Sequence, residues 1–331
     1  RMAANPFLAP SPLPFGYPDF TAIREKHFLP AFREGMARQR AEVDAITADP
    51  APPTFENTIV AMERSGDVLR RVSAVFFVLA SSCSTEGIRA IEAEVAPLLA
   101  AHADAIRLDP ALFARIEAIV AAAGPATAGA KGAAPDDAAV REAEDGAEDR
   151  RLVERYHRDA VRAGARLAPA EQERLRAINA ELSSLTTEFG NRLLAGAAAA
   201  AVHVTDPVQL DGLTPDALSA AARAARSRGL DGHLLTLVLP TDQPALAALT
   251  DRDLRERLHT ASVTRGLGGA HDTRGTLLKI VGHRAQRAHL LGHPHHASWV
   301  VETATAADVE AVDAMLQRVA PITAANARRE T

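Results

Sequence analysis

The spacing of apolar residues restricts the possible folds of this chain more than any other feature of its sequence. In residues 54–79, TFENTIVAMERSGDVLRRVSAVFFVL, apolar side chains recur with a spacing of three or four, at Ile59, Met62, Leu69, Val72, Phe76 and Leu79. That period places them on one face of an α-helix, and Thr54 has the hydroxyl that suits an N-cap. The segment therefore predicts one amphipathic helix whose apolar face must be buried.

The same period returns along most of the chain. It resumes after Thr85, which is placed as the next N-cap. Asp109 and Pro110 then have the order of an N-cap and a first helical residue, and Gly124 is placed to end that helix. A long helix over 169–196 has the apolar spacing of an antiparallel helix pair, at Leu175, Ile178, Leu182, Leu185, Phe189 and Leu193. Further helices are expected at 251–262, 272–291 and 306–328.

The region 201–240 has a different pattern. AVHVTDP and GHLLTLVLP alternate apolar and other residues, with the apolar positions at Val202, Val204, Leu235, Leu237 and Leu239. Alternation with a period of two predicts strands, and residues 214–229 between them predict a short helix. The expected fold class is therefore mainly α, with long amphipathic helices and a small two-stranded β element near residues 201–240.

One segment lacks residues to bury. Residues 124–149, GPATAGAKGAAPDDAAVREAEDGAED, consist mainly of Gly, Ala, Pro and acidic residues. We interpret them as a flexible insertion or linker in preference to an acidic segment that binds a partner. The chain is then expected to divide into a helical region at 5–123, this linker, and a second helical region with the β element at 150–331.

Charge and cysteine content argue against several classes of protein. The formal net charge is -5 and no basic patch is concentrated in the sequence, so we expect no nucleic-acid partner. No apolar run approaches the roughly 20 residues of a membrane helix, and prolines interrupt the start of the chain where a signal peptide would be apolar. The single cysteine, Cys83, is expected to be inert and points to a reducing compartment, so the expected location is the cytoplasm.

The stretch HLLGHPHH, residues 289–296, raises the question of a metal site. His289 and His293 stand four apart, as do the two zinc ligands of a helical HExxH motif. That motif also needs a glutamate after its first histidine, and Leu290 stands there. Gly292 is placed to end the helix, so His293 should lie beyond it. We predict a structural turn. The buried face of the preceding helix is expected to run through Leu277, Val281, Arg284, Ala288 and Leu291.

Several segments carry a resemblance to a known family. In chain order they are NPFLAPSPLPFGYPDFTAIREKHFLPAF, PPTFENTIVAMERSG, LRRVSAVFF, RYHRDAVRAGARL, LTLVLPTDQPALAALTDRDLRERLH, TRGLGGAHDTR and AHLLGHPHHASWVVE. Together they resemble the N-terminal half of the M3-family zinc oligopeptidases, most closely the peptidyl-dipeptidase (dipeptidyl carboxypeptidase) and oligopeptidase A branch. The resemblance runs from about Asn5 to Arg329, interrupted at 124–149.

The resemblance implies a neurolysin-like, zincin-type metallopeptidase that hydrolyses short peptides. In this family one zinc is held by HExxH and a downstream glutamate, in the second half of the polypeptide. None of the twelve histidines here begins HExxH. No catalytic, metal-ligand or cofactor-binding residue is therefore assigned in this chain. The chain starts with Arg1 and stops inside the helical pattern NARRET, so we expect an inactive portion whose C-terminal half is missing.

The expected role of this portion is one wall of the cleft that admits peptide substrates. The polar residues near the 265–274 turn, which are Arg265, His271, Asp272 and Arg274, are candidates to face such a cleft. Asp272 is also placed to cap the helix that follows, and we favour that role. The alternative function is a non-catalytic helical scaffold or binding protein.

Overall fold

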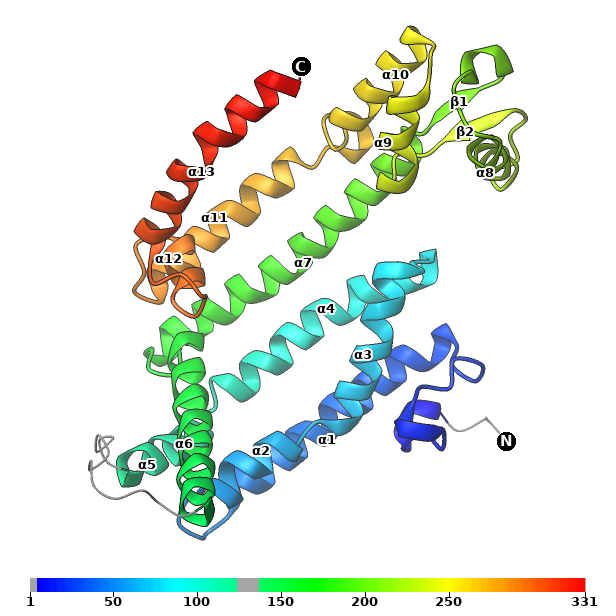
Figure 1. Cartoon of the computed structure of the whole chain (residues 1–331). Coiled ribbons are helices and arrows are strands. Elements are labelled where there is room, and N and C mark those ends of the chain that lie inside the picture. Colours follow the sequence, from blue (N-terminus) through cyan, green and yellow to red (C-terminus); the bar gives the residue numbers. More distant parts are fainter. Residues whose placement is uncertain (1–4, 124–136, 331) are drawn as a thin grey trace. The chain divides into compact units, whose positions relative to one another are not determined.

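The computed structural model describes residues 5–123 and 137–330, which form two compact units (Figure 1). Unit 1 contains the described residues up to Ser184 and those from His283 onward, and unit 2 contains Leu185–Gly282. Two long helices, α7 (Pro169–Ala199) and α11 (Arg274–Leu290), contribute residues to both units. The predicted mainly α fold class is confirmed. Within these residues, no helix combines the length and the apolar content needed to cross a bilayer.

Unit 1 is built from helices whose ends follow local sequence signals. Besides parts of α7 and α11 they are α1 (Phe28–Ala48), α2 (Ala61–Arg64), α3 (Asp67–Ser82), α4 (Glu86–Arg107), α5 (Pro110–Ala123), α6 (Asp137–Ala163), α12 (His296–Val301) and α13 (Val309–Glu330). The Thr85 hydroxyl accepts a hydrogen bond from the Ile88 N–H at 3.1 Å, and the Asp109 carboxylate accepts one from the Leu112 N–H at 3.0 Å. Both predicted N-caps are therefore confirmed.

The single helix predicted over 54–79 is wrong, because the chain breaks at Ser65 and Gly66. Thr54 caps a π-helical turn (Phe55–Val60) that leads into α2, and α3 begins after Gly66. Gly66 has φ +74°, a left-handed conformation that glycine adopts without a Cβ penalty, and its N–H donates to Glu42 Oε2 at 2.7 Å. The apolar spacing continues across the break because α2 and α3 both pack against α1.

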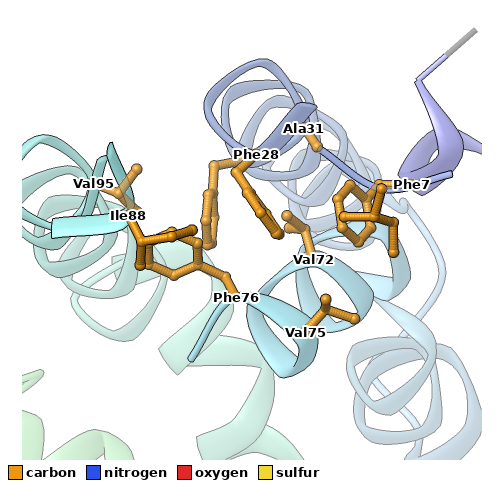
Figure 2. Close-up of a cluster of buried hydrophobic side chains, with 10 residues drawn as sticks. Phe7, Phe28, Ala31, Val72, Val75, Phe76, Ile88 and Val95 are labelled. Atoms are coloured by element: carbon orange, nitrogen blue, oxygen red, sulfur yellow. The ribbon is translucent and has the colours of Figure 1, made fainter. Parts of the chain in front are cut away.

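An aromatic cluster forms the core between α1 and α3 (Figure 2). Phe28, Phe32 and Phe76 are almost fully buried, and the ring of Phe76 meets the other two edge-on with centroids 5.2 Å apart in each pair. The helices approach closely beside it, since a Cβ on Gly35 would lie 2.9 Å from the backbone nitrogen of Leu69. Burial of large rings in preferred edge-to-face geometry stabilises this part of unit 1.

Unit 2 holds the predicted β element. Strand β1 (Val202–Val204) pairs antiparallel with β2 (His233–Leu235), with Val202 opposite Leu235. The helices of this unit, besides parts of α7 and α11, are α8 (Pro215–Arg226), α9 (Leu239–Ala248) and α10 (Arg252–Val263). The second strand is shorter than predicted, because Leu239 begins α9 and is 69% exposed. Pro240 explains this end, since proline lacks the N–H of a strand ladder and suits the first turn of a helix.

The predicted buried face of α11 is wrong over most of its length. Leu277 and Val281 are 46% and 54% exposed, and Arg284 is exposed, whereas Thr273, Thr276 and Ile280 are buried. Burial of the threonines is tolerated because their hydroxyls are hydrogen-bonded, Thr273 to the Gly266 carbonyl and Thr276 to Glu188. Only Ala288 of the predicted face is fully buried.

The segment 124–149, interpreted as a linker, falls partly outside the described residues. Residues 124–136, including Gly124, lie outside them, and 137–149 form the first part of α6 instead of a loop. Alanine and glutamate favour helix, which accounts for α6 extending into a segment with little to bury. The division into regions at 5–123 and 150–331 stays a prediction.

Candidate functional site

The histidine-rich turn lies where α11 ends in unit 1. Gly292 has φ +84°, and its N–H donates to the His289 carbonyl at 3.0 Å. The His293 N–H donates to the Ala288 carbonyl at 2.8 Å. This pair of hydrogen bonds is the Schellman arrangement that ends a helix. The predicted helix end at Gly292 is confirmed, and His293 does not stand one turn above His289.

Two of the histidines contact groups that follow the helix. His289 Nε2 lies 2.9 Å from the Pro294 carbonyl oxygen, and because a carbonyl only accepts, this nitrogen carries the proton. His293 Nε2 lies 3.6 Å from Glu302 Oε2. These contacts connect the turn to its own continuation.

The other two histidines belong to α12. His295 Nδ1 accepts a hydrogen bond from the Ser298 N–H at 3.1 Å, so the histidine acts as the N-cap of α12. The ring of His296 stacks on Trp299, with centroids 5.8 Å apart and planes at 21°. Burial, followed by the charges of Arg284 and Arg287, lowers the pKa of His296.

Two arginines approach the indole ring of Trp299. The guanidinium carbon of Arg287 lies 4.6 Å from the ring centroid and that of Arg162 lies 5.2 Å from it. Arg162 also donates to the Trp299 carbonyl at 2.8 Å and forms an ion pair with Glu302. Each cation–π contact is worth about 0.5–2 kcal/mol, depending on how far it is desolvated. These contacts connect α12 to α6 and α11.

A buried acid continues this network into α4 and α7. Asn179 donates to both carboxylate oxygens of Asp104 at 3.0 Å, and its own carbonyl oxygen accepts from Arg287 at 3.4 Å. Asp104 is only 8% exposed. Burial raises the pKa of Asp104, while the hydrogen bonds from Asn179 and the charges of nearby arginines oppose that rise. Burial also lowers the pKa of Arg287.

The network around Trp299 positions a turn and brings no zinc-ligand set together. Among residues 5–123 and 137–330, no three His, Cys, Asp or Glu residues are grouped closely enough to hold a metal ion. The zinc that the resemblance implies therefore does not fit the donors that these residues present. No catalytic step is assigned to it here.

The other candidate residues, near the 265–274 turn, precede the histidine turn in the sequence. Their hydrogen-bond partners are different from those of the histidines. Arg265 donates to the Leu237 carbonyl at 3.2 Å, and His271 lies in a 3-10 turn. The Asp272 carboxylate accepts from the Arg274 N–H, the first N–H of α11, at 2.9 Å, but Thr273 and not Asp272 directly precedes this helix. Hydrogen bonds from the Arg274 side chain and backbone lower the pKa of Asp272. Cys83 is exposed.

Sequence reasoning did not identify the residues that hold the turn. Arg162, Arg287, Asp104 and Asn179 are separated by up to 183 positions (287 minus 104) and carry no shared motif. One signal in the sequence could have identified Arg287. It lies two helical turns after the buried Ile280, so it lies on the same face of α11. The single tryptophan of the chain was the aromatic partner to look for.

Comparison with known proteins gives a consistent set of relatives. No protein-family model matches the chain. It is 38% identical over 319 residues to dipeptidyl carboxypeptidase of Escherichia coli (strain K12), covering 96% of this chain and 44% of that protein. It is 37% identical to the Salmonella typhimurium dipeptidyl carboxypeptidase, over 97% of this chain and 45% of that protein. It is 26% identical to oligopeptidase A of Salmonella typhimurium, over 86% of this chain and 40% of that protein. The chain thus spans less than half the length of these relatives.

Proposed function

We propose a function for this chain on the premise that it is homologous, over nearly its whole length, to part of the M3-family peptidases dipeptidyl carboxypeptidase and oligopeptidase A. The chain supplies the helical, metal-free part of a peptidase that hydrolyses short peptides. One observation carries the proposal, namely 38% identity over 319 residues to a dipeptidyl carboxypeptidase. Identity at that level over such a length supports a common ancestor rather than a shared helical composition.

The proposed division of labour follows from the chemistry of metallopeptidases. A metal-activated water attacks any peptide bond that reaches it, so selectivity depends on access. We assign access to this chain, because its long helices are stiff and held at their ends by the contacts of Asp109, Gly292 and Trp299. We assign the zinc ligands and the general base to residues outside this sequence, since no HExxH occurs in it.

The test measures hydrolysis and metal content together. The 331-residue chain and the full-length product of its gene are purified, treated with a chelator, dialysed and assayed with a blocked tripeptide, with and without added zinc. We expect zinc-dependent hydrolysis by the full-length product and none by the 331-residue chain. Hydrolysis by the 331-residue chain would refute the assignment of the zinc ligands. A full-length product that binds peptides without cleaving them would favour the scaffold function.

We also propose that the protein works in the cytoplasm on short peptides. The exposed Cys83 is the only cysteine of this sequence, and an exposed thiol persists best in a reducing compartment. Cell fractionation with an antibody against the chain tests the location, and recovery outside the cytoplasm would contradict it.

A further inference from the structure

Helix α13 carries an apolar stripe that none of its described neighbours covers. No residue of this 22-residue helix is buried. The exposed apolar side chains share one face and are Met315 (47% exposed), Leu316 (53%), Val319 (48%) and Ile322 (63%). Their spacing of three or four residues is that of a helix built to pack against another element.

The opposite face of α13 indicates what kind of surface the stripe can meet. It carries Glu310, Asp313 and Arg328, so charges of both signs stand on the polar side. A helix that lies on a membrane surface has a polar face rich in lysine and arginine. The mixed charges therefore favour a protein partner over a lipid surface.

The way α13 is attached locates the uncovered part. Val309 and Val312, at the start of the stripe, are half-buried, and α13 packs there against α12. From Met315 onward the stripe is exposed over two further turns. The stripe is therefore continuous with an internal contact and extends beyond it.

The length of the relatives identifies the occupant. This chain spans 44% of the Escherichia coli dipeptidyl carboxypeptidase, so that protein contains as much chain again as is present here. A partner within the same polypeptide meets the stripe at an effective concentration of the order of millimolar, which exceeds what a second copy in dilute solution provides. An intramolecular partner therefore has the advantage over self-association.

We infer that the stripe formed by Met315, Leu316, Val319 and Ile322 is the docking surface for the metal-binding part of the same peptidase. This inference rests on the proposed function and names the partner of one particular helix face. It assigns to α13 the role of joining the helical part to the part that holds the zinc.

Thiol accessibility tests the inference at two positions on opposite faces of α13. In a Cys83→Ser background, Ile322→Cys places a thiol on the stripe, and Ala324→Cys places one on the exposed opposite face as a matched control. Maleimide labelling of each cysteine is followed by mass spectrometry of its peptide, in the 331-residue chain and in the full-length gene product. Peptidase activity of the full-length product is measured in parallel.

In the 331-residue chain both thiols should react at rates within about threefold of each other. In the full-length product the thiol at position 322 should react at least about tenfold more slowly, with the thiol at 324 unchanged. Equal rates at both positions in the full-length product would overturn the inference. Protection of position 322 in the 331-residue chain that grows with protein concentration would assign the stripe to a second copy and overturn it as well. Protection without any peptidase activity would refute the proposed function while leaving a covered stripe.

Discussion

Replacing Gly35 by alanine tests whether close helix contact or helix propensity decides stability in unit 1. Inside a helix, alanine is favoured over glycine by about 1 kcal/mol. Most exposed helical glycines should therefore gain stability from this change. At Gly35 the new Cβ would lie 2.9 Å from both the backbone N and the Cα of Leu69 on α3. Neither atom can rotate away, so the two helices must separate.

The cost of that separation exceeds the gain in helix propensity. Overpacking a tight core costs about 1–3 kcal/mol, and a clash with backbone atoms belongs in the upper part of that range. Subtracting about 1 kcal/mol for propensity leaves a net loss of about 1–2 kcal/mol in the free energy of unfolding. The separation also loosens the edge-to-face contacts of Phe76 with Phe28 and Phe32. Gly35→Val should cost about 3 kcal/mol or more, because a larger side chain adds to the clash.

A matched control makes the sign of the effect decisive. Gly146 lies inside α6 of the same unit, and no atom lies within 4 Å of a Cβ placed there. Gly146→Ala should therefore leave stability unchanged or raise it by up to about 1 kcal/mol. Urea unfolding followed by the fluorescence of Trp299, the single tryptophan, reports on unit 1 for both variants. If Gly35→Ala stabilises as much as Gly146→Ala, the close approach of α1 and α3 is not real.

Three further predictions concern buried polar groups and the histidine turn. Arg115→Ala should lower the free energy of unfolding, measured by urea unfolding, by about 2–3 kcal/mol. The reason is that the nearly buried Arg115 side chain donates hydrogen bonds to the Asp49 and Ala51 carbonyls. A loss below about 0.5 kcal/mol would contradict this. The raised pKa of Asp104 means that the folded state holds this proton more tightly, so stability should fall as pH rises from the ordinary carboxyl pKa through the raised one. Asp104→Asn should flatten that fall in urea midpoints measured against pH, and an unchanged slope would count against burial as its cause. His289→Ala and His293→Ala should leave the peptidase activity of the full-length product within a few-fold, and a loss of several orders of magnitude would restore this turn as a catalytic site.

Features set by neighbouring residues were predictable from the sequence. The N-caps at Thr85 and Asp109 each depend on a side chain and on N–H groups two or three residues away. The helix end at Gly292 depends on the six consecutive residues 288–293 and on the left-handed φ that glycine permits. The β element at Val202–Val204 likewise showed a local alternation. In each case the sequence signal lies within a few consecutive residues, although β1 needs β2 to complete its hydrogen bonds.

Features that depend on distant partners were not predictable in this way. At the break, the Gly66 N–H donates a hydrogen bond to Glu42, which is 24 residues earlier. The inner face of α11 was misplaced because apolar residues were assumed to mark it, whereas Thr276 is buried through a hydrogen bond to Glu188, 88 residues away. A period in the sequence gives the faces of a helix, but the partner on each face decides which one is buried.

The histidine turn shows why spacing alone is weak support for a metal site. Two histidines four apart converge on one ion only if the helix between them continues, since that places both rings on one face. Here the Schellman hydrogen bonds at Gly292 end the helix before His293. The His289 Nε2 proton is then directed to the Pro294 carbonyl, and His295 caps the next helix. The residues around the second histidine therefore carry more information than the separation of the pair. Gly292 ends the helix and Pro294 cannot continue it, and without a continuous helix the spacing has no coordination geometry to support.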